Sequence, residues 1–204
     1  MIGINEIIAI IPARKGSKRL KNKNTFLLNN RPLIEYTIMA AKKSNFIDKI
    51  IVSTDSKKIL SIANKNGIKV NKLRPKKLSE DNTPTIDVIK YETKKLKKKN
   101  YFILVLQPTS PLRSTSEIDK SIEILYEKNL SSLVSISKYK SKPKFEILKN
   151  RKKTITNFNP VKKNKYFYGL NGSIFLSTLY FINKYNRLYK KGSYCYETKY
   201  KTSI

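Results

Sequence analysis

Residues 10–24 read IIPARKGSKRLKNKN, an apolar run that passes into a loop rich in cations. The full apolar run, Ile7 to Ile11, consists of the residue types that fill a buried strand. Gly16 then allows a backbone turn with positive φ, and it lets main-chain N–H groups approach a ligand closely. This order of residue types predicts a buried strand followed by an anion-binding loop.

The side chains of this loop are suited to a triphosphate. Ser17 supplies a hydroxyl, and Arg14, Lys18 and Lys23 can bind several phosphate oxygens together. The loop matches neither G-x-G-x-x-G nor G-x-x-x-x-G-K-[ST]. A solvated basic loop is the alternative in so lysine-rich a chain, but it would not explain Pro-Ala-Arg and Gly-Ser-Lys directly after a buried strand. We therefore interpret the stretch as a phosphate-binding loop.

The net charge of +30 raises the possibility of a nucleic-acid-binding protein. Lysine far outnumbers arginine, the basic residues are spread from Lys15 to Lys201, and interleaved aromatic residues of the RRM type are absent. We interpret most of the charge as compositional, and we expect no nucleic-acid partner.

Length and residue types narrow the class of protein further. The 204 residues are enough for a single domain, 1–204, with a real core. We expect a cytoplasmic protein, because the N-terminus lacks a basic signal-peptide region and no apolar stretch is long enough to span a membrane. The single cysteine, Cys195, excludes an intramolecular disulfide, and the lack of histidine excludes an imidazole base or metal ligand.

The hydrophobic pattern alternates between strand and helix, with polar loops after the strands. This order is typical of an α/β fold with an open, mostly parallel sheet and helices on both faces. We expect strands over residues 6–12, 49–53, 68–73, 101–106 and 133–137, and helices over 33–44, 57–66, 84–98, 117–128 and 178–189.

Several helix ends carry recognisable signals. Gly67 is expected just after the second helix, Thr83 as an N-cap followed by Pro84, and Ser114 with Glu117 as a capping box. Residues 138–168 break the alternation, with short β-like pieces at Phe145–Leu148 and Thr154–Phe158. We expect an excursion from the sheet there, used for dimer contact.

In open parallel sheets, ligands bind beyond the carboxyl ends of the strands. The polar loops that contain Arg14, Asp55, Arg74 and Gln107 all follow predicted strands. Their convergence predicts one shared site. Asp55 is a candidate Mg²⁺ ligand, with a helix cap next to Ser56 as the alternative.

Four motifs occur in order along the chain: IPARKGSKRLKNKN from Ile11, VSTD from Val52, LQPTSPLR from Leu106 and NGSIF from Asn171. In this order and spacing they resemble the acylneuraminate cytidylyltransferases, or CMP-sialic acid synthetases. The segment Leu78–Thr85 is more similar to the branch that handles pseudaminic or legionaminic acid. The resemblance implies a Rossmann-like sheet of the nucleotide-sugar transferase type.

The resemblance also implies an activity, which is transfer of CMP from CTP to the anomeric hydroxyl of a nine-carbon keto-acid sugar, with release of pyrophosphate. It implies Mg²⁺ as cofactor and a homodimer. Arg14 and Lys23 would be the catalytic residues that neutralise the triphosphate. The implied substrate-binding residues are Ala13, Gly16, Ser17, Lys18, Asn24, Arg74, Thr83, Thr85, Gln107 and Asn171.

The sequence departs from the family at two places. Gly169 stands where members have an arginine two residues before the asparagine of the N-G motif. Members continue after a serine–isoleucine pair into an Asp-x-Asp that holds Mg²⁺, whereas this chain ends at Ser203-Ile204. We therefore expect either a truncated C-terminus or a protein that lacks the usual metal ligands. The alternatives are a 3-deoxy-manno-octulosonate cytidylyltransferase, an inactive nucleotide-binding remnant and a basic nucleic-acid-binding protein.

Overall fold

The computed structural model describes residues 6–16, 20, 22–94, 96, 100–139, 146–158 and 167–198. Its main sheet has β9 antiparallel between β5 and β6, and parallel pairing for β1 with β4, β1 with β5 and β6 with β10. The expected mostly parallel α/β sheet is confirmed. In spatial order the strands are β10 (Tyr194–Glu197), β6 (Ser132–Tyr139), β9 (Phe167–Thr178), β5 (Tyr101–Val105), β1 (Glu6–Pro12) and β4 (Lys49–Ser53).

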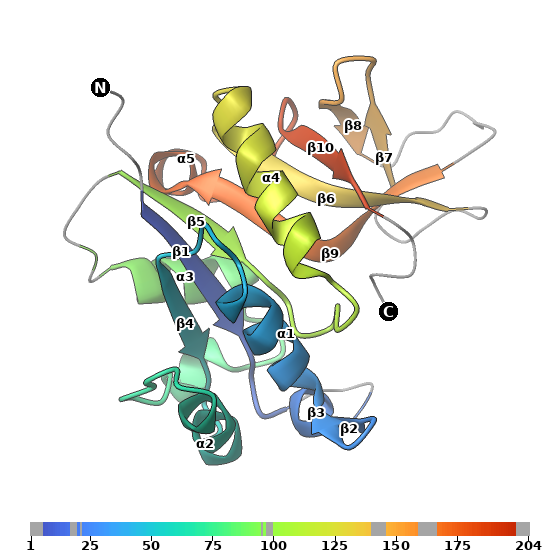
Figure 1. Cartoon of the computed structure of the whole chain (residues 1–204). Coiled ribbons are helices and arrows are strands. Elements are labelled where there is room, and N and C mark those ends of the chain that lie inside the picture. The colour runs from blue at the N-terminus through green and yellow to red at the C-terminus, as the bar shows by residue number, and fades with distance from the viewer. Residues whose placement is uncertain are drawn as a thin grey trace.

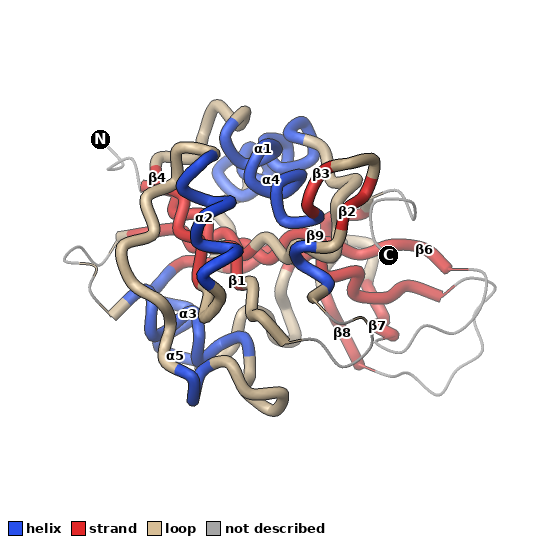
Figure 2. Tube along the Cα trace, turned by 90° about the horizontal axis from the view of Figure 1, so that it is seen from below, coloured by secondary structure: helices blue, strands red, loops and turns tan. Residues whose placement is uncertain are grey.

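Among the described residues, five α-helices cover the two faces of this sheet, and Figure 2 shows the strands as a layer between them. One face carries α1, α2 and α4, and the other carries α3 and α5 (Figure 1). Their bounds are α1 Leu33–Lys42, α2 Lys57–Lys65, α3 Thr85–Thr93, α4 Thr115–Glu127 and α5 Leu179–Tyr185.

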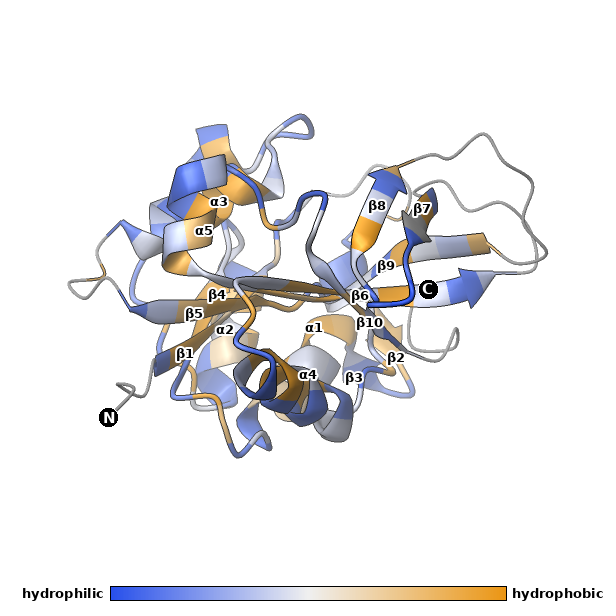
Figure 3. Ribbon diagram, turned by 90° about the horizontal axis from the view of Figure 1, so that it is seen from above, coloured by the Kyte–Doolittle hydropathy of each residue, from blue (hydrophilic) through white to orange (hydrophobic). Residues whose placement is uncertain are grey.

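The alternation of side chains along β1 divides the core into two layers. Ile7, Ala9 and Ile11 pack with α1, α2 and α4, whereas Ile8 and Ile10 pack with α3 and α5. Successive strand residues point to opposite faces, so a central strand must be apolar throughout. Figure 3 shows these apolar strands between the more hydrophilic outer surfaces of the helices.

In the part of the chain that the structure describes, four short β-strands lie outside the path of the main strands. β2 (Leu27–Leu28) and β3 (Arg31–Pro32) form a two-stranded ribbon before α1, which the sequence pattern did not predict. β7 (Glu146–Lys149) pairs with β9 and with β8 (Ile155–Phe158), close to the two short β pieces that were expected.

Two helix ends are as predicted. Gly67 follows α2 with a φ of 80°, in the left-handed region that suits a residue after a helix. Ser114 and Glu117 form the capping box of α4. The C-terminal strand β10 and the early end of α5 at Tyr185 were not foreseen.

The strand expected over residues 68–73 is wrong. β4 is the last strand of the sheet on that side, and residues 68–73 have no β pairing. The backbone there is bound by other groups: Val70 N–H donates to the side chain of Asn64, and Arg74 N–H donates to the carbonyl of Thr54. The segment therefore runs from α2 to the carboxyl end of β4 as a loop.

The expected start of α3 is also wrong. Pro84 is the N-cap residue, with an extended backbone, and the helix begins at Thr85. The hydroxyl of Thr83 donates to the carbonyl of Lys77 instead of capping the helix. Within the described part of the chain, no helix combines the length and the apolar character needed to cross a membrane.

Candidate functional site

A polar cavity of about 290 Å³ lies where β1 and β5 end. It is formed by the loop after β1, the loop between Arg74 and α3, and the segment after β5. This is the carboxyl edge at which an open parallel sheet binds ligands. The predicted site residues that line it are Arg14, Gly16, Lys23, Asn24, Arg74, Thr83, Thr85 and Gln107.

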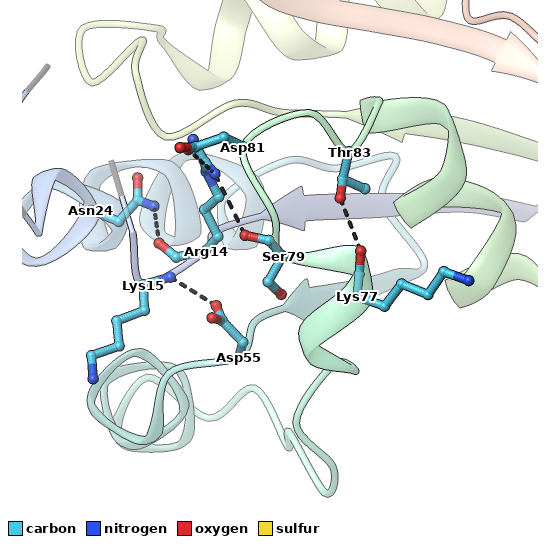
Figure 4. Close-up of polar contacts among 8 residues, drawn as sticks. All are labelled: Arg14, Lys15, Asn24, Asp55, Lys77, Ser79, Asp81 and Thr83. Carbon is cyan, nitrogen blue, oxygen red and sulfur yellow. Dashed lines mark hydrogen bonds and ion pairs between the residues drawn. The ribbon is translucent and has the colours of Figure 1, made fainter. Parts of the chain in front are cut away.

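Arg14 projects toward the loop that precedes α3. Its Nη1 lies 2.6 Å from Oδ1 of Asp81 and 3.5 Å from the carbonyl oxygen of Ser79 (Figure 4). Both members of the ion pair are partly exposed to the cavity. A cation held by an exposed carboxylate can exchange that partner for a phosphate at small cost, because exposed ion pairs contribute about 0–1 kcal/mol.

Arg74 is a second cation beside the first, but it is only 5% exposed. Its Nε donates to the hydroxyl of Ser79 at 3.0 Å. Burial lowers the pKa of Arg74, while the charges of Asp55 and Glu92 act in the opposite direction. Ser79 thus contacts both arginines, Arg14 through its carbonyl and Arg74 through its hydroxyl.

Two side chains hold the backbone of the loop after β1 in place. Nδ2 of the buried Asn24 donates to the carbonyl oxygen of Arg14 at 2.9 Å. On the other side of the loop, Oδ1 of Asp55 accepts from the N–H of Lys15 at 2.8 Å (Figure 4). The alternative role for Asp55, a cap on the following helix, falls to its neighbour Ser56, whose hydroxyl accepts from the N–H of Ile59.

Gln107 lies two residues after the end of β5 and lines the cavity. The segment that it begins is held by Arg113, whose Nη2 donates to the carbonyl oxygen of Gln107 at 2.9 Å. Arg113 is 3% exposed, and this burial lowers its pKa to about 9. The sequence motifs did not predict that Arg113 holds this segment in place. The feature that could have predicted it is a single cation in a proline-containing turn, directly before the N-cap residue of a helix.

Two of the predicted residues, Ala13 and Asn171, do not line the cavity. Ala13 is fully buried at the end of β1 and does not line the cavity. The side chain of Asn171 binds three hydroxyl groups within the sheet, those of Ser135, Ser137 and Thr198. Ser17 and Lys18 lie outside the described residues. The substrate roles of these four residues stay predictions.

The carboxylates of the site provide a limited set of metal ligands. Glu80 and Asp81 line the cavity, and Asp81 is paired with Arg14. In the ranges that the structure describes, no group of three or more His, Cys, Asp and Glu side chains could hold a metal ion. In nucleotide-binding sites, Mg²⁺ is held by one or two protein carboxylates together with phosphate oxygens of the nucleotide. The described residues therefore fit a metal ion that is bound mainly by the phosphates of the nucleotide.

Residues 8–202 match the family model described as cytidylyltransferase. The chain is 37% identical over 188 residues to the CMP-N,N'-diacetyllegionaminic acid synthase of Legionella pneumophila. This alignment covers 84% of this chain and 78% of that protein. It is 42% identical over 119 residues to the N-acylneuraminate cytidylyltransferase of Escherichia coli, 58% of this chain but only 28% of that longer protein.

The fold also has solved counterparts. The structure of a CMP:2-keto-3-deoxy-manno-octonic acid synthetase complexed with CTP superimposes with a TM-score of 0.79, covering 96% of this chain and 90% of that one. The sequence identity in this superposition is 15%, so the likeness concerns the fold alone. With the family match over nearly its whole length and a cavity at the carboxyl edge of its sheet, the chain belongs to the cytidylyltransferase family.

Proposed function

We propose that this chain transfers CMP from CTP to the anomeric hydroxyl of a sialic-acid-like nonulosonic acid, with release of pyrophosphate. The proposal rests above all on one observation. Arg14 and Lys23, from the segment after β1, and Arg74, from the segment before α3, line one cavity at the carboxyl ends of β1 and β5. Three cations around one polar cavity suit a triphosphate better than a neutral ligand.

The reaction forms a bond between the sugar oxygen and the α-phosphorus of CTP, and it breaks the bond from that phosphorus to the bridging oxygen of pyrophosphate. The hydroxyl proton is lost, and negative charge grows on the phosphoryl oxygens and on the leaving group. Catalysis of such a step is mainly positioning and electrostatic stabilisation. Arg14 and Lys23 would stabilise this charge, while the N–H groups near Gly16 would bind the outer phosphates.

The nucleoside and sugar would lie deeper in the same cavity. The residues proposed to contact them come from the loop after β1, the start of α3 with the loop before it, and the segment after β5: Asn24, Arg74, Thr83, Thr85 and Gln107. Mg²⁺ is included in the proposal as a cofactor that would offset the charge of the triphosphate. Asp55 is its proposed protein ligand.

A homodimer in the cytoplasm is part of the same proposal. The contact between the two copies would involve β7 and β8, the excursion from the path of the main strands. Sedimentation equilibrium of the chain would test this: a mass of two chains at micromolar concentration supports the dimer, and a single-chain mass at all concentrations contradicts it.

The activity is tested by pyrophosphate release from CTP in the presence of single sugars. The panel consists of N-acetylneuraminic acid, a diacetylated legionaminic acid, a diacetylated pseudaminic acid and 3-deoxy-manno-octulosonic acid. We expect turnover with one of the three nonulosonic acids. Preference for the octulosonic acid would reassign the sugar. Protection against thermal unfolding by CTP without turnover on any sugar would instead identify a nucleotide-binding remnant.

Arg14→Ala tests whether Arg14 binds the phosphates of CTP, or whether the loss of any positive charge from the protein has the same effect. We expect it to reduce kcat/KM at least a hundredfold, because it removes a charge that would bind the phosphates in the transition state. Lys190→Ala is the control, since Lys190 contacts the ring of Tyr185 away from the cavity. Equal effects of the two substitutions would refute the role of Arg14.

A further inference from the structure

Strand β9 has an irregularity in its pairing with β6, opposite Ser135. The side chain of Asn171 makes hydrogen bonds across this irregularity. Its Oδ1 accepts from the hydroxyl of Ser135 at 2.5 Å. Its Nδ2 donates to the hydroxyls of Ser137 and Thr198, at 2.8 and 2.7 Å. Bulges of this kind redirect the backbone and recur next to functional sites. In this chain, the residue that follows Asn171 at the bulge is Gly172.

Gly172 lies against the side chain of Gln107. Its φ is +73°, and a Cβ at this position would be 2.8 Å from Oε1 of Gln107 and 3.7 Å from its Cδ. Real Cβ atoms do not approach an oxygen this closely, and the Gln107 side chain is the more mobile partner. Any side chain at position 172 would therefore displace the carboxamide of Gln107.

Arg113 makes hydrogen bonds to both backbone segments at this contact, the one at Gln107 and the one at Ser173. Its guanidinium donates to the carbonyl oxygen of Gln107 at 2.9 Å and to the carbonyl oxygen of Ser173, next to Gly172, at 2.7 Å. A further N–H donates to the hydroxyl of Thr37 in α1 at 3.1 Å. The flat guanidinium can hold several acceptors in fixed directions, which a lysine ammonium cannot reproduce.

We propose that Gly172 and Arg113 are positioning residues for Gln107. Arg113 fixes the backbone of Gln107 relative to β9, and Gly172 leaves the space in which its carboxamide lies at the cavity. The two residues act together from opposite sides of one contact. This inference rests on the proposed function only in that Gln107 is taken to contact the substrates.

The first test needs no ligand. The side-chain amide signals of Gln107 are assigned in ¹⁵N-labelled protein by their loss in Gln107→Ala, and are then compared in Gly172→Ala and Gly192→Ala. Gly192 is the matched control, because it has a φ of +91° and no atom within 4 Å of an added Cβ. We expect Gly172→Ala alone to shift these signals. Signals that stay in place, or that move equally in the control, overturn the proposal.

The second test measures CTP affinity by calorimetry. We expect Gly172→Ala to weaken binding at least fivefold relative to Gly192→Ala, and this difference to vanish in a Gln107→Ala background. An equal difference in both backgrounds would mean that Gly172 does not act through Gln107, which overturns the proposal. If the wild-type chain does not bind CTP, the proposed function fails while the first test still decides the positioning role.

Arg113→Lys keeps the charge and removes the flat donor geometry. We expect it to shift the Gln107 signals as Gly172→Ala does. Should this variant not fold, Thr37→Val serves instead, because it removes one acceptor of the guanidinium and leaves the arginine in place. Unchanged Gln107 signals in the variant that folds would exclude Arg113 from the positioning role.

Discussion

Nη1 of Arg14 lies 2.6 Å from Oδ1 of Asp81, and both residues line the same cavity. The cation proposed for the phosphates thus has a carboxylate partner of its own. Arg14 and Asp81 come from different loops, so the pair also connects the loop after β1 to the loop before α3. A triphosphate would have to replace this carboxylate as the partner of Arg14.

Asp81→Asn should therefore tighten CTP binding. Removing one negative charge from the cavity releases Arg14 and lessens repulsion of the phosphates, a gain of about 1 kcal/mol or roughly fivefold in Kd for partly exposed charges. Calorimetric titration at low ionic strength measures it. Glu127→Gln, an exposed charge change at the end of α4, is the control. Weaker binding in Asp81→Asn would show that the carboxylate itself contacts the ligand.

Asp55 can act as a loop anchor or as a metal ligand, and two substitutions separate these roles. Asp55→Ala removes the acceptor for the Lys15 N–H, whereas Asp55→Asn retains an oxygen at that position. In EDTA, where no metal is bound, we expect Asp55→Ala to weaken CTP binding about fivefold and Asp55→Asn by much less, because losing the hydrogen bond costs about 1 kcal/mol. Equal losses would indicate that the charge, and not the anchor, matters.

The capping box of α4 contributes to stability without touching the cavity. Ser114→Ala removes the acceptor for the N–H of Glu117, so we expect a loss of about 1 kcal/mol and a fall in Tm of about 2–4 °C. CTP affinity should not change. Ser61→Ala, at an exposed position inside α2, is the matched control and should leave Tm nearly unchanged. Equal shifts in both variants would remove the capping explanation.

Cys195 should be unreactive in the folded chain. Burial raises the pKa of its thiol from 9.0 to about 12, so at pH 8 its thiolate fraction is about a thousandfold smaller than that of an ordinary cysteine. Reaction with Ellman's reagent at pH 8 should be slow in the native protein and fast in guanidinium chloride. Rapid reaction of the native protein would contradict the burial of this strand.

The same shift predicts a dependence of stability on pH. Between pH 9 and 12 the folded thiol keeps its proton while the unfolded thiol loses it, so the free energy of unfolding falls as the pH rises through this window. From pH 8 to pH 10 the contribution is about 1 kcal/mol. Urea unfolding of wild type and Cys195→Ala at both pH values measures it, and equal pH dependence in the two proteins would contradict the prediction.

Local features of the sequence were enough to predict several parts of the structure. The buried runs of β1 and β5, the glycine after α2 and the capping box of α4 depend on residues close together in the chain, and each was recognisable from its pattern. The strand expected over residues 68–73 failed for the opposite reason. A strand needs a partner, and the sheet ends at β4.

The amino-acid order alone settled which residues are apolar, where α1 and α2 begin and which loops carry cations, because these properties depend on the nearest neighbours in the chain. The partners were decided by the fold: Asp81 for Arg14, Lys15 for Asp55, and Ser173 for Arg113. The physical reason is that a hydrogen bond depends on positions in space, and residues 40 or more places apart meet only when the strands have taken their order in the sheet.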